Sequence, residues 1–115
     1  MLSHEKLIVY KRSIEFLSVA VTIMESIPRG HSALIDQLRR ASMSVPLNIA
    51  EASGRTGSGD NARHFSIARG SALECGAILD VCSILEIVNS QLMQNGKSLL
   101  GEVVAMLSKL CIKTS

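Results

Sequence analysis

The arginines of this sequence are clustered, and their chemistry suits the binding of phosphate groups. Six of the seven arginines lie between positions 29 and 69, where the formal charge is +3, against −1 for the rest of the chain. A guanidinium group is a planar fork that binds a phosphate through two hydrogen bonds, so this region is a candidate surface for an RNA or DNA backbone. The candidate contacts are Arg39, Arg40, Arg55, Arg63 and Arg69.

The same arginines also have a simpler interpretation as ordinary charges on helix surfaces. Asp36 and Glu51 precede Arg40 and Arg55 by four residues. That spacing is typical of a surface ion pair worth about 0.3 kcal/mol. The chain has only three aromatic residues, too few for a platform on which successive bases stack. If nucleic acid binds, we therefore expect contacts to the phosphate backbone.

Groups that could catalyse a reaction or hold a metal are sparse. No histidine follows a glutamate by three residues, which excludes the Glu-x-x-His pairs of di-iron bundles. Cys75, Cys82 and Cys111 form an odd set without a CxxC pair, which argues against a disulfide framework or a zinc site. His64, beside Arg63, is a further candidate for phosphate contact. We expect no enzymatic activity, no metal and no cofactor.

The composition predicts one domain over residues 1–115 with an aliphatic core. The chain has 47% hydrophobic and 19% charged residues, which excludes a disordered or collagen-like class. The central apolar stretch between Glu15 and Glu25 is far shorter than the ~20 residues that cross a bilayer, so we expect no membrane association. Reduced cysteines favour the cytoplasm.

Apolar residues recur in alternating steps of three and four in four segments, the pattern of packed helices. Pro28 and Gly30 separate the first two segments, and a glycine-rich loop at 53–59 separates the next two. Two starts are considered for the fourth segment, because Asn95-Gly96 could delay the helix to Lys97. We predict an all-α, antiparallel up-and-down four-helix bundle with helices at about 4–27, 32–53, 59–89 and 91–112.

The first helix has two apolar lines instead of one. We assign the bundle core to the line Leu7, Tyr10, Ile14, Leu17, Val21 and Met24. The second line forms either part of a broad core face or an interface between copies of the chain, and we favour the interface. The predicted interface residues are Phe16, Ala20, Ile23 and Ile27.

Two residues of the second helix are expected to shape it. Pro46 removes a backbone donor and collides with the carbonyl of Ser42, which predicts a kink. Asn48 occupies a position on the apolar stripe. A buried amide there more often fixes the register of neighbouring helices than performs catalysis.

Several segments, taken in order, resemble one known family. They are Gln37-Leu38-Arg39-Arg40-Ala41, Ser44–Glu51 (SVPLNIAE), Gly54-Arg55, Arg63-His64-Phe65 and Ile67–Glu74 (IARGSALE). The sequence is similar to four-helix-bundle proteins encoded in intervening sequences of large-subunit ribosomal RNA genes, a family that includes the accessory variability proteins of diversity-generating retroelements. The resemblance extends over nearly the whole chain, with Ala52 standing where the motif usually has glycine.

The resemblance implies a small cytoplasmic bacterial bundle that assembles into a ring of five copies and has no known catalytic residues. The retroelement members bind nucleic acid and a reverse transcriptase through a basic surface. Carried over by position, the contacts are the five arginines named above, with Pro46 and Asn48 as shape-determining residues. The favoured hypothesis is a homo-oligomer that binds ribosomal RNA or another nucleic acid. The alternative is a protein-interaction scaffold, for example an accessory subunit of a reverse transcriptase.

Overall fold

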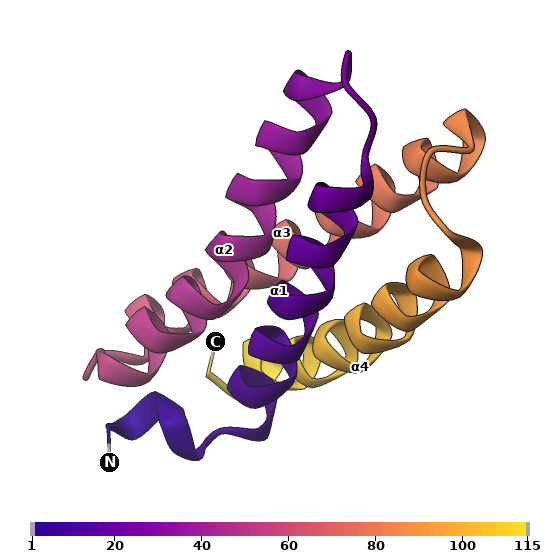
Figure 1. Ribbon diagram of the computed structural model, residues 1–115. Coiled ribbons are helices and arrows are strands. Elements are labelled where there is room, and N and C mark those ends of the chain that lie inside the picture. Colours follow the sequence, from indigo (N-terminus) through magenta and orange to yellow (C-terminus); the bar gives the residue numbers. More distant parts are fainter. Residues whose placement is uncertain (1, 115) are drawn as a thin grey trace.

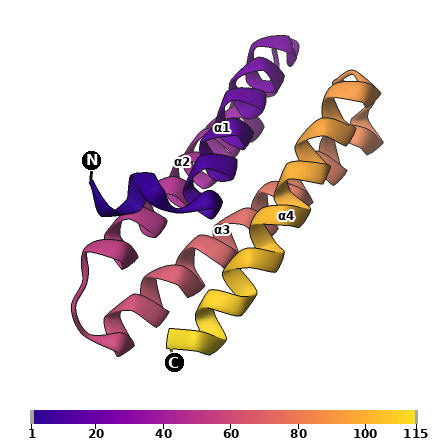
Figure 2. The ribbon, with the colours of Figure 1, turned by 90° about the horizontal axis from the view of Figure 1, so that it is seen from below.

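The computed structural model describes residues 2–114 and folds them into four α-helices after a short 3-10 turn (Figure 1). The elements are η1 (Ser3–Lys6), α1 (Ile8–Ser26), α2 (Ser32–Gly54), α3 (Ser58–Leu85) and α4 (Ser90–Thr114). Helix α1 packs against α2 and α4, and α3 packs against the same two helices. Figure 2 shows the α1–α2 pair beside the α3–α4 pair. The predicted all-α four-helix bundle is confirmed.

The first predicted helix is divided in two. Leu7 has an extended backbone (φ −77°, ψ 128°), so the turn at Ser3–Lys6 is separate from α1. At the other end, Ile27 is also extended (φ −70°, ψ 128°). It precedes Pro28, and a proline disfavours helical geometry in the residue before it.

The connection between α3 and α4 begins earlier than predicted. Helix α3 ends at Leu85 because Glu86 adopts the left-handed conformation (φ 55°, ψ 41°). The backbone N–H of Ile87 then donates to the carbonyl of Cys82 at 3.3 Å, a bond typical of a helix C-terminus. The predicted end at residue 89 is therefore four residues too late.

Helix α4 begins at Ser90, so Asn95-Gly96 does not delay it. The side chain of Asn89 accepts a hydrogen bond from the backbone N–H of Leu92 at 3.1 Å, which is an N-cap contact. Gly96 lies inside the helix, where an added Cβ would come within 3.1 Å of Leu79 Cδ1 and 3.5 Å of Phe16 Cε1. Glycine at this position lets α4 approach α3 and α1 closely.

The residues of α1 predicted as an interface lie instead in the core. Phe16, Ala20, Ile23 and Ile27 are buried in the core of the single chain. The prediction that these four side chains form an oligomer interface is therefore wrong, because the chain's own helices cover them.

The line that we assigned to the core is instead the more exposed one, with Ile14 40% and Val21 42% exposed. A polar residue, Ser13, belongs to the buried line and lies between Val9 and Phe16. Ser13 is fully buried, and its hydroxyl donates to the backbone carbonyl of Tyr10 at 2.6 Å.

The predicted core stripes of the other three helices agree with the structure. Leu38 and Val45 of α2, Leu79 of α3 and Leu107 of α4 are among the side chains buried in the common core. Helix α2 continues through Pro46 to Gly54, and the kink expected at the proline stays a prediction. Within the described residues, no helix combines the length and apolar character that a membrane span requires.

Candidate nucleic-acid interface

A polar seam connects α2 to α3 inside the otherwise apolar contact between these helices. Its members are Ser44 and Asn48 of α2 and His64 and Ser71 of α3. The hydroxyl oxygens of Ser44 and Ser71 lie 2.8 Å apart. The amide nitrogen of Asn48 donates to the carbonyl of Ser44 at 2.9 Å and lies 3.1 Å from its hydroxyl. These four residues are called the α2–α3 seam below.

His64 lies in this seam and is not a surface group. Its side chain is largely buried, with 8% of the residue exposed, and Nδ1 lies 3.1 Å from Oδ1 of Asn48. Since the amide nitrogen of Asn48 faces a carbonyl, its oxygen faces His64, and Nδ1 must carry the proton that is donated. Nε2 then accepts from the guanidinium of Arg63 at 3.4 Å. The histidine thus holds α3 against α2 and orients Arg63.

Arg40 is exposed at one end of the seam. It lines a hollow of about 330 Å³ together with Ser44, Ser71 and Glu74. The predicted ion pair from Asp36 to Arg40 does not form, because Asp36 binds Arg39 one residue earlier, at 3.0 Å. Within residues 2–114, Arg40 has no carboxylate within ion-pair distance, so its guanidinium is available to a ligand.

Arg55 and Arg63 are the next two candidate arginines. Arg55 lies just past the end of α2, where its backbone is extended (φ −88°, ψ 145°), and it lines a hollow with His4 of η1. Its guanidinium is 3.1 Å from the carboxylate of Glu51, the pair that the sequence predicted. Arg63 is exposed on α3 and makes no ion pair in the described part of the chain. Arg40 and Arg63 therefore border the seam, from α2 and from α3, and we call them the seam arginines.

The other two candidate arginines lie elsewhere. Arg39 is displaced by about 100° around α2 from Arg40 because it is the neighbouring residue on the helix. The Nε of Arg69 donates to the hydroxyl of Ser108 at 2.8 Å, and that hydroxyl donates to the carbonyl of Val104 at 2.8 Å. Arg69 is half-buried and braces α3 against α4. The structure therefore does not bring the five predicted arginines together around the seam.

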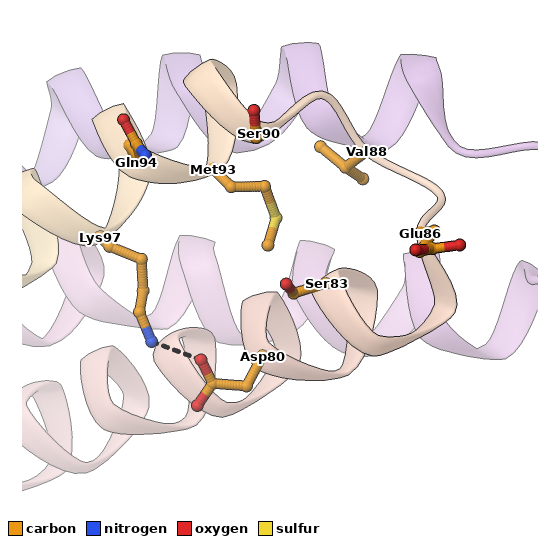
Figure 3. Close-up of a pocket in the computed structure, with 8 residues that line it drawn as sticks. All are labelled: Asp80, Ser83, Glu86, Val88, Ser90, Met93, Gln94 and Lys97. Atoms are coloured by element: carbon orange, nitrogen blue, oxygen red, sulfur yellow. Dashed lines mark hydrogen bonds and ion pairs between the residues drawn. The ribbon is translucent and has the colours of Figure 1, made fainter.

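A larger cavity near the α3–α4 turn has a different chemistry. It has a volume of about 590 Å³, and the side chain of Met93 points into it (Figure 3). Two carboxylates, Asp80 and Glu86, and one ammonium group, Lys97, line it, and Lys97 forms an ion pair with Asp80. The cavity therefore carries no uncompensated positive charge with which to bind a phosphate, and its lining includes neither histidine nor cysteine.

The buried thiols are held in their protonated form. Burial raises the pKa of Cys75 to about 12, with a further increase from the charge of Glu74, and burial also raises the pKa of Cys82. A protonated thiol is a weak nucleophile and a poor metal ligand. Within residues 2–114, no three His, Cys, Asp or Glu side chains converge as a metal site would require.

The fold and its seam define a small four-helix-bundle protein with a cationic α2–α3 surface. The chain belongs to the 23S rRNA-intervening sequence protein family, whose model matches residues 5–109. A comparison with curated proteins found no match. The matched range includes parts of all four helices.

Sequence reasoning did not find the role of His64, although the signal is present. His64 and Ser71 are seven residues apart and therefore lie on one face of α3. Ser44 and Asn48 are four apart and lie on one face of α2. Polar residues at such spacing on two adjacent helices indicate a hydrogen-bonded contact between them.

Proposed function

We propose that this protein is a non-enzymatic module that binds the phosphate backbone of RNA along the α2–α3 seam. The observation that carries this proposal is the pair Arg40 and Arg63. Both are exposed, neither has an ion-pair partner in the described residues, and they border the seam from its two helices. Positive groups without carboxylate partners bind phosphate by releasing its counterions.

The dimensions of the surface fit a short stretch of nucleic acid. Arg40 precedes Asn48, whose partner His64 adjoins Arg63, by eight residues, or about 12 Å of helix at 1.5 Å per residue. That length corresponds to about three or four stacked nucleotides at 3.4 Å each. The name of the family refers to 23S rRNA, which supports RNA as the ligand. The scarcity of aromatic residues supports contacts to the backbone and not base stacking.

The proposed assembly is a homo-oligomer, a ring of five copies, as the sequence resemblance implied. Because the chain's own helices cover Phe16, Ala20, Ile23 and Ile27, we place the proposed interface on exposed residues of α1 instead. Ile14 and Val21 on α1 and Met43 on α2 are large apolar side chains exposed to solvent. Figure 1 shows these two helices running side by side. An oligomer would bury this apolar surface and repeat the seam arginines around the ring.

The same exposed side chains support a second candidate function, that of a protein-interaction scaffold such as an accessory subunit of a reverse transcriptase. In that case another protein covers the exposed side chains of Ile14, Val21 and Met43. The seam arginines then need not bind RNA. Three cysteines without a disulfide fit a reducing cytoplasm under either proposal.

A salt titration tests the first proposal. We expect a fluorescently labelled single-stranded RNA to bind the full chain at low salt, with log K falling linearly as log salt concentration rises. Each phosphate that the protein neutralises contributes about −0.7 to the slope of log K against log salt concentration. An affinity that does not change with salt, or the absence of binding at low salt, would contradict backbone recognition. Capture of one protein partner after nuclease treatment would favour the scaffold instead.

A further inference from the structure

A second binding surface lies between the start of α1 and the end of α4. Here the two helices leave an open groove of about 530 Å³. Apolar side chains, including Ile8, Met106 and Leu110, form its floor, and three lysines line its rims. The lysines are Lys6, Lys109 and Lys113. We call this surface the α1–α4 groove; it is distinct from the α2–α3 seam.

The charge of the groove is entirely positive. It contains three of the five lysines of the chain, and no carboxylate is among its lining residues. Within the described residues, none of these three ammonium groups lies in an ion pair. Lys97, in contrast, is paired with Asp80 beside its own cavity. The α1–α4 groove therefore has the charge that complements an acidic ligand.

The apolar floor restricts what that ligand can be. Ile8 is 63% exposed, so a large aliphatic side chain faces solvent next to the cationic rim. A nucleic-acid backbone would neutralise the lysines but leave this apolar surface uncovered. A single small amphiphile would remain largely in water, because small-molecule sites enclose most of the surface of their ligand.

The geometry of the rims fits a helix. Met106, Lys109, Leu110 and Lys113 follow the i, i+3, i+4, i+7 pattern, so they share one face of α4 over about 10 Å. Lys6 supplies a cation from η1, at the other end of the chain. A helix with one apolar stripe, flanked by Asp or Glu, would place its stripe on the floor and its carboxylates against the lysines.

We propose that the α1–α4 groove binds an amphipathic acidic helix of a partner protein. The groove accommodates about two turns of such a helix, with carboxylate-to-lysine contacts at its edges. This proposal does not depend on RNA binding at the α2–α3 seam.

A peptide pair tests the proposal on the full chain by fluorescence polarisation. The probe is a labelled helical peptide of leucine, glutamate and alanine, about 18 residues long, with leucine at every third or fourth position. The control peptide has the same composition with leucines distributed around the helix. We expect the first peptide to bind at least tenfold more tightly, and its addition to shift the backbone amide NMR signals of residues 6–9 and 106–113.

Substitutions in the protein separate the contribution of the lysine charges from that of the apolar floor. The double variant K109E/K113E should weaken binding about tenfold or more by reversing the rim charge. Ile8→Ser should weaken it severalfold at every salt concentration. Lys11→Glu, an exposed lysine of α1 outside the groove, is the matched control and should bind as the wild type does. Circular dichroism checks that every variant retains its helices.

Three results would overturn the proposal. Equal binding of the two peptides would show that the groove does not recognise an apolar stripe. Unchanged binding by K109E/K113E would place the peptide elsewhere. An RNA that binds the groove, losing affinity in K109E/K113E but not in a variant of Arg40 and Arg63, would make it a nucleic-acid site.

Discussion

The Nδ1 atom of His64 lies 3.1 Å from the Oδ1 atom of Asn48, joining α3 to α2 by a hydrogen bond between side chains. Asn48 is in turn held by two contacts to Ser44, so its amide orientation is determined. This relationship links the polar interior of the bundle to its cationic surface, because the other ring nitrogen of His64 accepts from Arg63.

Asn48→Ala should destabilise the bundle. It would leave the buried imidazole of His64 without its acceptor, and an unpaired buried polar group costs about 1–3 kcal/mol. We expect the free energy of unfolding, measured in urea, to fall by that amount. Asn95→Ala is the control, because the side chain of Asn95 accepts a hydrogen bond from Gln91 on the exposed surface of α4, and its effect should stay below about 0.5 kcal/mol. Equal effects would contradict the structural role of Asn48.

Reversing the charge of the seam arginines should weaken RNA binding. In the double variant R40E/R63E, two unpaired cations become acids, so affinity should fall at least tenfold and the salt slope should decrease by about 1.4, at about 0.7 per phosphate contact. R29E/R39E makes the same charge change at two exposed arginines outside the seam. A larger loss in this control, measured by fluorescence polarisation, would place the RNA on another side of the bundle.

The exposed line of α1 predicts where copies of the chain meet. I14D/V21D should dissociate an oligomer into folded monomers, because it introduces charges into the apolar surface that assembly would bury. Light scattering coupled to size-exclusion chromatography measures the mass. Phe16→Asp should instead unfold the protein, since this side chain is in the core. A wild-type protein that is monomeric at micromolar concentration would contradict the proposed assembly.

The raised pKa of Cys75 predicts a loss of stability at alkaline pH. Its folded-state pKa is about 12, against an ordinary value of 9.0, so above pH 9 the unfolded chain releases a proton that the folded chain retains. This thiol should therefore destabilise the fold by about 1.4 kcal/mol at pH 10 relative to pH 8. Urea unfolding at both pH values checks this loss. In Cys75→Ala the loss should shrink by that amount, and an unchanged loss would contradict the assignment.

Two glycines of α4 should respond differently to the same substitution. Gly101→Ala should stabilise the protein by about 0.5–1 kcal/mol, since the added methyl meets open space and alanine favours the helix. At Gly96 the methyl would press on Leu79 Cδ1 at 3.1 Å, so Gly96→Ala should gain less and Gly96→Val should destabilise. Thermal unfolding measures the difference. An equal gain at both positions would show that α4 can move away from α3.

The sequence was sufficient to predict the helix number and most core residues, because the spacing of apolar residues on α2, α3 and α4 is unambiguous. It did not determine which line of α1 is buried, since both lines are apolar and the positions of α2 and α4 decide between them. Ser13 is buried in that line although it is polar, because its hydroxyl is satisfied within its own helix.

The sequence predicted which arginines are candidates for the site, but it did not predict how they are arranged in space. The five arginines lie close together in sequence, but two successive helical positions such as Arg39 and Arg40 point to different sides of the helix. Arg63 and Arg69, six residues apart on α3, also point to different sides, and the structure is needed to show that Arg69 contacts Ser108 of α4. The end of α3 depends on the left-handed backbone of Glu86, a conformation for which this residue type gives no signal.

The α2–α3 seam has a consequence for the energetics of recognition. A slip of one helical turn between α2 and α3 would break the Ser44–Ser71 and Asn48–His64 contacts together. The separation of Arg40 from Arg63 along the bundle is therefore set when the chain folds. Folding therefore already fixes the backbone beneath these two cations, and binding costs no further backbone entropy there. The surface is preorganised for a ligand whose negative charges have a fixed spacing.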